Sequence, residues 1–182
     1  MSLNYYVSLI KADYESRFSG GLTTAKFIKS YLFDINFRVV VRYRIQSYFF
    51  YKKGLGKILA VLIRNGNIKK YGIEIGLNSR IDGGLHVHHV NGIVIGNNVR
   101  VGTNFNIFQQ VTIGKKGEGY PIIGNDVWIY PGSKVIGNIV IEDNVIVGAN
   151  SIVYKNVKAK KVVAGIPAKE ILGNRQEKKE VR

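Results

Sequence analysis

Apolar residues recur at helical spacing through the first part of the chain, between Thr23 and Tyr71. The positions that follow this pattern are Phe27, Tyr31, Val39, Val40, Tyr43, Ile45, Phe49, Phe50, Leu59, Leu62 and Ile63. The spacing predicts two helices, over residues 24–52 and 56–71, separated by a break at Gly54 and Gly56. A further short helix is expected within residues 1–20.

The hydrophobic period changes to six residues after Gly72. Aliphatic residues occupy every position of three successive series, which are Ile75, Ile81, Val87 and Ile93, then Ile95, Val101, Ile107 and Ile113, then Ile123, Ile129, Val135, Ile141, Val147 and Val153. Each hexad can form one short strand and a turn, and its apolar side is buried only when repeats stack. Because three hexads close one triangular coil, residues 73–158 are expected to form a parallel β-helix of four to five coils.

Two irregularities interrupt this repeat. The register slips by two residues after Ile93, and four extra residues lie within Lys115–Ile122. Since the repeat resumes in phase afterwards, the extra residues must leave the coil as a bulge and a loop. Irregular segments of a regular solenoid are frequent sites of function.

Composition excludes several classes of protein. The 182 residues are 46% hydrophobic and 21% charged, which is typical of a folded chain with one core. Cysteine is absent, so disulfides, cysteine–zinc sites and thiol nucleophiles are excluded. The sequence has neither an apolar run of about 18 residues nor a secretory leader pattern, and we expect a cytoplasmic protein.

The net charge of +15 is concentrated in the first part of the chain. Residues 1–72 contain 13 Lys and Arg against 3 Asp and Glu, giving +10, and residues 73–182 contain 14 against 9, giving +5. Two interpretations of the basic helices remain open: they cap the end of the β-helix, or they contact an anionic membrane from its inner face. Nucleic-acid binding is the other class of function that such a charge suggests, but no nucleic-acid-binding motif accompanies it.

Four segments carry a resemblance to a known family. They are VRYRIQSYFF at 41–50, GLHVHHVNGIVIG at 84–96, NIFQQVTIG at 106–114 and VVAGIPAKEILG at 162–173. Together with the repeat, they resemble the serine acetyltransferase-like branch of the hexapeptide-repeat acyltransferases, which includes capsular and exopolysaccharide O-acetyltransferases. The resemblance implies a left-handed parallel β-helix over 73–173 with a C-terminal extension, after an N-terminal helical segment over 1–72 and before a charged tail over 174–182. It also implies a homotrimer with active sites between subunits.

The three histidines of the chain, His86, His88 and His89, lie within four residues. Acyl transfer from a thioester to a hydroxyl needs a base, and histidine is the usual one near neutral pH. The family motif assigns this role to His89 and implies that Glu74 is its acidic partner; Glu74 lies 15 residues upstream, so stacked coils are expected to bring the two together. Two alternatives are that the histidines are ordinary coil residues, or that they bind zinc. The three histidines are close together in the sequence, and in an extended segment His88 and His89 point to opposite faces, which disfavours zinc. We therefore expect no metal.

The acceptor expected from the sequence is a sugar. Serine acetyltransferases carry an Arg-His pair before a proline in the loop after V-T-I-G, where this chain has Gly119, Tyr120 and Pro121. His88 replaces the acidic residue that precedes the catalytic histidine. A clamp for an amino-acid carboxylate is therefore missing, and Tyr120 and His88 are expected to bind sugar hydroxyls. The prediction is an O-acetyltransferase of polysaccharide biosynthesis, with serine O-acetyltransferase as the alternative.

The resemblance implies acetyl-CoA as the acyl donor. Gly114, Lys115, Pro131 and Ala149 match positions that line the donor groove in the family. The nucleotide phosphates require cations, which the lysines near the end of the β-helix offer; the predicted binding set is Lys155, Lys160, Lys161 and Lys169.

Overall fold

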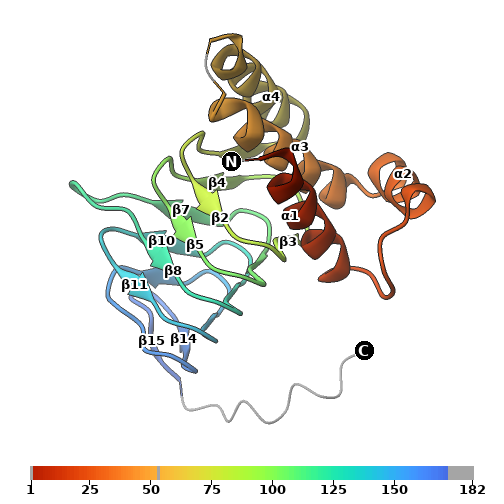
Figure 1. Cartoon of the computed structure of the whole chain (residues 1–182). Helices are drawn as coiled ribbons and strands as arrows, with labels where there is room; N and C mark the ends of the chain where they lie inside the picture. Colours follow the sequence, from red (N-terminus) through yellow and green to blue (C-terminus); the bar gives the residue numbers. More distant parts are fainter. Residues whose placement is uncertain (1, 53, 172–182) are drawn as a thin grey trace.

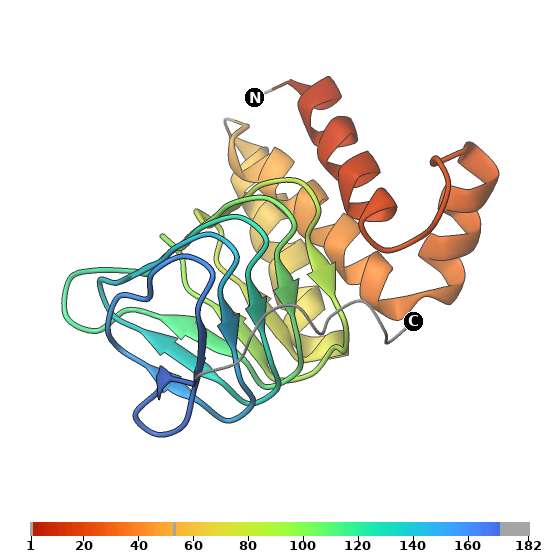
Figure 2. The same cartoon turned by 90° about the horizontal axis from the view of Figure 1, so that it is seen from below.

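A computed structural model describes residues 2–52 and 54–171. Four helices come first: α1 (Leu3–Glu15), α2 (Thr24–Phe33), α3 (Ile35–Phe50) and α4 (Leu55–Tyr71). They cover one end of a stack of coils, and the last coil lies at the opposite end (Figures 1 and 2). The predicted charged tail lies outside the described residues.

The predicted helix over 24–52 is wrong in one respect, because α2 and α3 are separate helices that meet at Asp34. This residue has an extended backbone, with φ −107° and ψ 106°, and its carboxylate accepts hydrogen bonds from the N–H groups of Asn36 and Phe37. Aspartate is a favoured N-cap because it satisfies N–H groups that have no partner within the helix. No glycine or proline marks this break in the sequence.

The described residues that follow α4 form a parallel β-helix of about five coils, as predicted. Its first face consists of β1 (Ile73–Ile75), β4 (Ile93–Ile95), β7 (Thr112–Gly114), β10 (Lys134–Ile136) and β13 (Ile152–Val153). The second consists of β2 (Arg80–Ile81), β5 (Arg100–Val101), β8 (Ile122–Ile123) and β11 (Val140–Ile141). The third consists of β3 (His86–Val87), β6 (Asn106–Ile107), β9 (Trp128–Ile129), β12 (Ile146–Val147), β14 (Val162–Ala164) and the antiparallel β15 (Lys169–Glu170).

The periodic aliphatic residues point inward, as the pattern predicted. All fourteen members of the three series are buried in one continuous core. Val39, Val40 and Tyr43 of α3 belong to the same core, so the helices close the end of the β-helix with apolar contacts. Among the helices of the described residues, none has the length and apolar character that a membrane crossing requires.

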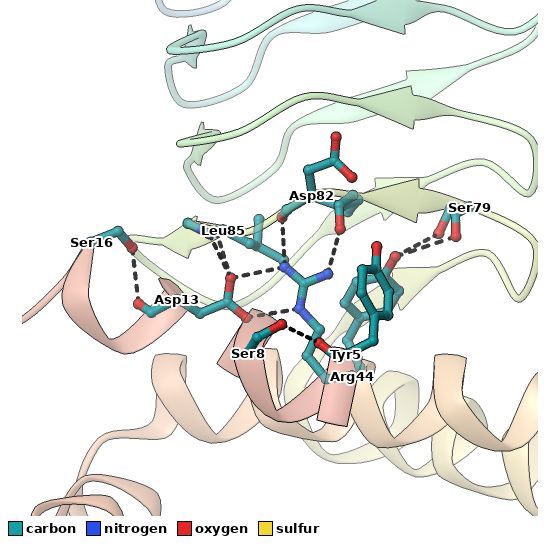
Figure 3. A network of polar contacts seen from close by, with 11 residues as sticks. Tyr5, Ser8, Asp13, Ser16, Arg44, Ser79, Asp82 and Leu85 are labelled. Carbon is teal, nitrogen blue, oxygen red and sulfur yellow. Dashed lines mark hydrogen bonds and ion pairs between the residues drawn. The ribbon is translucent and has the colours of Figure 1, made fainter. Parts of the chain in front are cut away.

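A buried ion pair joins the helices to the first coil (Figure 3). The carboxylate of Asp13 in α1 accepts hydrogen bonds from Nε and Nη2 of Arg44 in α3, each at 2.8 Å, and both residues are 1% exposed. Asp13 Oδ1 also accepts from the N–H groups of Gly84 and Leu85, and Arg44 donates to the carbonyls of Ile81 and Asp82. Burial lowers the pKa of Arg44, but the charge and hydrogen bonds of Asp13 outweigh it and raise that pKa above its usual value. The backbone just before the histidines is thus held through both its N–H groups and its carbonyl groups.

Candidate active site

The histidines lie where the β-helix departs from its regular path. Strand registers pair Val87 with Ile107 and Val94 with Thr112. Val94 therefore follows Val87 by seven positions, whereas Thr112 follows Ile107 by five. The two extra residues thus fall between Val87 and Ile93, a correction to the expected slip after Ile93. Both Ile93 and Ile95 remain in the core, so the bulge is the turn that contains His88 and His89.

His86 and His88 are part of a stack of rings on the third face. The two imidazoles lie 3.9 Å apart and nearly parallel, and His88 stacks on Phe108 at 4.1 Å. His88 Nε2 lies 3.0 Å from Asn106 Oδ1, and the amide of Asn106 is oriented by its own donation to the Asn104 carbonyl. Nε2 of His88 must therefore carry the proton and donate it. His88 is held in place on both ring faces and at one nitrogen.

Both stacked histidines are kept neutral by their surroundings. Burial is the main cause that lowers the pKa of His86 to about 4; the charge that His88 would carry if protonated and the positive charge of Arg17 lower that pKa further. Burial also lowers the pKa of His88. In contrast, His89 is exposed, and its ring lies 6.4 Å from that of Phe108 at an angle of 51°. Of the three histidines, His89 is the most exposed, and His86 and His88 are partly buried.

The low pKa of His86 predicts a dependence of stability on pH. Between about pH 4 and 6.5 the unfolded chain binds a proton at this residue and the folded protein does not, so stability falls as the pH is lowered through that interval. Urea unfolding at pH 7 and pH 5 is expected to give a smaller free energy of unfolding at pH 5. His86→Phe, which keeps a ring in the stack, is expected to reduce the difference between the two values; an unchanged difference would contradict the assignment.

His89 shares one corner of the β-helix with two of the predicted donor-groove residues. Val87, Ile107, Ile129 and Val147 are paired in register on the third face. The residues two positions after Ile107, Ile129 and Val147 are Gln109, Pro131 and Ala149, which follow one another along the corner between the third and first faces. On the first coil the residue in register with Gln109 is Asn91, whose carbonyl accepts from the N–H of Gln110, so His89 lies in the bulge just before this position. Gly114 and Lys115 lie elsewhere, at the far end of β7.

Gln109 is a residue of this corner that the sequence analysis did not single out. Its Oε1 is buried and has no hydrogen-bond partner among the described residues. A buried amide oxygen without a partner is unfavourable by about 1–3 kcal/mol. The signal in the sequence was its offset of two residues from an inward aliphatic, which it shares with Pro131 and Ala149.

Glu74 and Tyr120 are placed differently from what their predicted roles suggest. The register pairs Glu74 with Val94 on the next coil, and no hydrogen bond or ion pair joins it to His89. Glu74 and His89 belong to the same coil, the first, because the two extra residues lengthen that coil. They therefore do not lie on stacked coils, contrary to the prediction from the sequence. The ring of Tyr120 lies over Gly96, where a Cβ atom would come within 2.6 Å of it, and packs against the core. The absence of a side chain at Gly96 is what admits this ring.

The predicted lysines surround a cavity of about 330 Å³ at the last coil. Lys155, Lys161 and Lys169 line it together with Lys158, which was not in the predicted set, whereas Lys160 is not among the lining residues. Lys158 pairs with Glu142 at 2.8 Å and Lys161 with Glu170 at 2.6 Å. Lys155 and Lys169 take part in no ion pair within residues 54–171, so they are the cations available to an anionic ligand.

Comparisons with known proteins agree with the fold and change the predicted function. A model of the bacterial transferase hexapeptide family, built on six repeats, matches residues 120–155. A serine acetyltransferase of Staphylococcus epidermidis is 45% identical over 100 residues, which are 53% of this chain and 47% of that protein. The chain thus spans about half the length of this curated relative.

Solved structures extend the similarity to the helices. Serine acetyltransferase of Neisseria gonorrhoeae in complex with serine superposes with a TM-score of 0.82 at 27% identity, covering 93% of this chain and 70% of that one. A serine acetyltransferase in complex with CoA superposes with a TM-score of 0.81 at 25% identity, covering 93% and 71%. The predicted role in polysaccharide biosynthesis, with a sugar acceptor, is therefore wrong. The alternative drawn from the sequence agrees better with these relatives than the main prediction did.

Proposed function

We propose that this chain transfers the acetyl group of acetyl-CoA to the hydroxyl of L-serine. The observation that supports it most is the position of His89 in a bulge at the corner that carries Pro131 and Ala149, in a β-helix similar to serine acetyltransferases solved with serine and with CoA. An exposed imidazole suits a reaction between a hydroxyl and a thioester, because it can take the hydroxyl proton as the oxygen attacks. The proposed assembly is a homotrimer, in which a neighbouring subunit completes the groove.

In the proposed mechanism, the free imidazole nitrogen of His89 removes the proton of the serine hydroxyl. The oxygen attacks the thioester carbonyl carbon and forms a tetrahedral intermediate. When the C–S bond breaks, the sulfur takes the proton back from His89, leaving O-acetylserine and CoA. The phosphates of CoA would bind near Lys155 and Lys169, which line the cavity at the last coil. Glu74 stays a proposed partner of His89.

A thiol-release assay with the purified chain tests this proposal. With acetyl-CoA and L-serine, we expect turnover of about 1 s⁻¹ or more, the ordinary range for enzymes. L-alanine is the matched acceptor because it lacks only the hydroxyl oxygen, and it should give no release above the acceptor-free rate. Equal rates with L-serine, L-alanine and no acceptor would contradict the proposed function.

A further inference from the structure

The helical layer holds the histidine turn at both of its ends. Nη1 of Arg17, just after α1, donates to the carbonyl of Val87 at 2.9 Å. The N–H of Val90 donates to Oδ1 of Asn36, in the first turn of α3, at 3.0 Å. His88 and His89 are the two residues between these anchor points.

Asp34 links the two anchors to each other. Its Oδ2 accepts from Nε of Arg17 at 2.7 Å, in a pair whose side chains are 17% and 21% exposed. Its Oδ1 caps the first turn of α3, the turn that carries Asn36. One carboxylate therefore fixes the guanidinium that holds Val87 and the start of the helix that holds Val90.

These anchors act where the backbone bonds of the β-helix are offset by the extra residues. The His88 N–H donates to the Ile107 carbonyl in the regular pattern of hydrogen bonds between coils. This pattern resumes at Asn91 and Gly92, which have positive φ values of 92° and 71°. At Val90, between these points, the N–H is bonded to Asn36 and not to a neighbouring coil. The backbone that follows His89 is thus fixed by a helix residue more than fifty positions earlier.

We propose that Arg17, Asp34 and Asn36 are positioning residues that set the place of His89 in the reaction. The inference rests on the proposed role of His89 as the base. A displacement of about 1 Å in a reacting group can lower the rate by up to about 100-fold, whereas donor binding at the distant lysines is not affected by it. The helices are therefore part of the catalytic arrangement as well as a cover for the core.

Three variants test this role. Asn36→Ala removes the acceptor for the Val90 N–H but favours the helix, since alanine has the highest helix propensity. Asn36→Asp keeps an acceptor oxygen and adds a charge that a helix N-terminus favours. Asn97→Ala is the matched control, because Asn97 Oδ1 accepts the Leu77 N–H at 2.9 Å, away from the histidines.

We expect Asn36→Ala to lower kcat tenfold or more, within the roughly 100-fold range of such displacements, with little change in the KM for acetyl-CoA. Asn36→Asp should retain most of the wild-type kcat, and Asn97→Ala should keep it.

A second readout separates this inference from the proposed function. Amide hydrogen exchange, measured without any substrate, should be faster at Val90 in Asn36→Ala than in the wild type and unchanged at Ile113 in the core. If the wild type does not turn over serine but Val90 behaves this way, the proposed reaction is wrong and the anchor exists. If Val90 exchange is unchanged, or if Asn36→Ala and Asn97→Ala give equal kcat values, the positioning role is wrong.

Discussion

Replacing His89 with alanine is expected to lower kcat by about 10²–10⁴-fold, the usual contribution of a general base. The affinity for acetyl-CoA should be nearly unchanged, because the proposed binding site for its phosphates is the cavity at the last coil. Steady-state thiol release with L-serine measures the first effect, and equilibrium binding of CoA measures the second.

Two other substitutions make this result specific. His88→Ala removes an imidazole that is stacked on Phe108 and bonded to Asn106, and is expected to have a smaller effect on kcat than His89→Ala. Glu74→Gln should also lower kcat less, since it leaves the base in place. If His89→Ala keeps more than about a tenth of the wild-type kcat, the loss is below the range of a general base and the assignment is wrong.

Removing one partner of the buried Asp13–Arg44 pair is expected to have the largest effect on stability. Asp13→Ala leaves the guanidinium of Arg44 without its counter-charge and the N–H groups of Gly84 and Leu85 without an acceptor. Breaking a buried ion pair in this way lowers the free energy of unfolding by about 3–5 kcal/mol. Urea unfolding at neutral pH measures the loss.

Two further variants complete this experiment. Asp13→Asn keeps an acceptor for Gly84 and Leu85 while removing the charge, so it remains informative if Asp13→Ala does not fold. Lys158→Ala breaks an ion pair on the surface, where the lysine side chain is 79% exposed, and should leave stability unchanged. Equal losses in Asp13→Asn and Lys158→Ala would show that burial of the Asp13–Arg44 pair does not matter.

The architecture was predictable because its signal is local and repeated. An inward aliphatic every six residues can be read directly from the sequence, and each of these positions is buried. The break at Asp34 was not predictable from hydrophobicity, because apolar spacing continues through it and the end of α2 depends on the capping of α3. The position of the slip was also ambiguous, since Ile93 and Ile95 both satisfy the pattern and both lie in the core.

The site was predictable to the extent that it lies on the repeat. Pro131, Ala149 and Gln109 share an offset of two residues from an inward aliphatic, which follows from the period and would have found Gln109. His89 lies in the bulge and was identified by its match to the family motif instead. The contacts of Arg17 with Val87 and of Asp13 with Gly84 join residues about seventy positions apart, and no periodicity encodes them. The acceptor was predicted wrongly because the uncharged Gly119 and Tyr120 were given more weight than the similarity of the whole β-helix to serine acetyltransferases.

A crystal structure of the chain with CoA and L-serine would show whether His89 is the catalytic base. We expect the serine hydroxyl to lie within hydrogen-bond distance of the His89 imidazole, with the CoA sulfur beside it. The pantetheine arm should follow the corner past Pro131 and Ala149, and the phosphates should lie near Lys155 and Lys169. Serine bound away from His89, or CoA bound away from this corner, would contradict it.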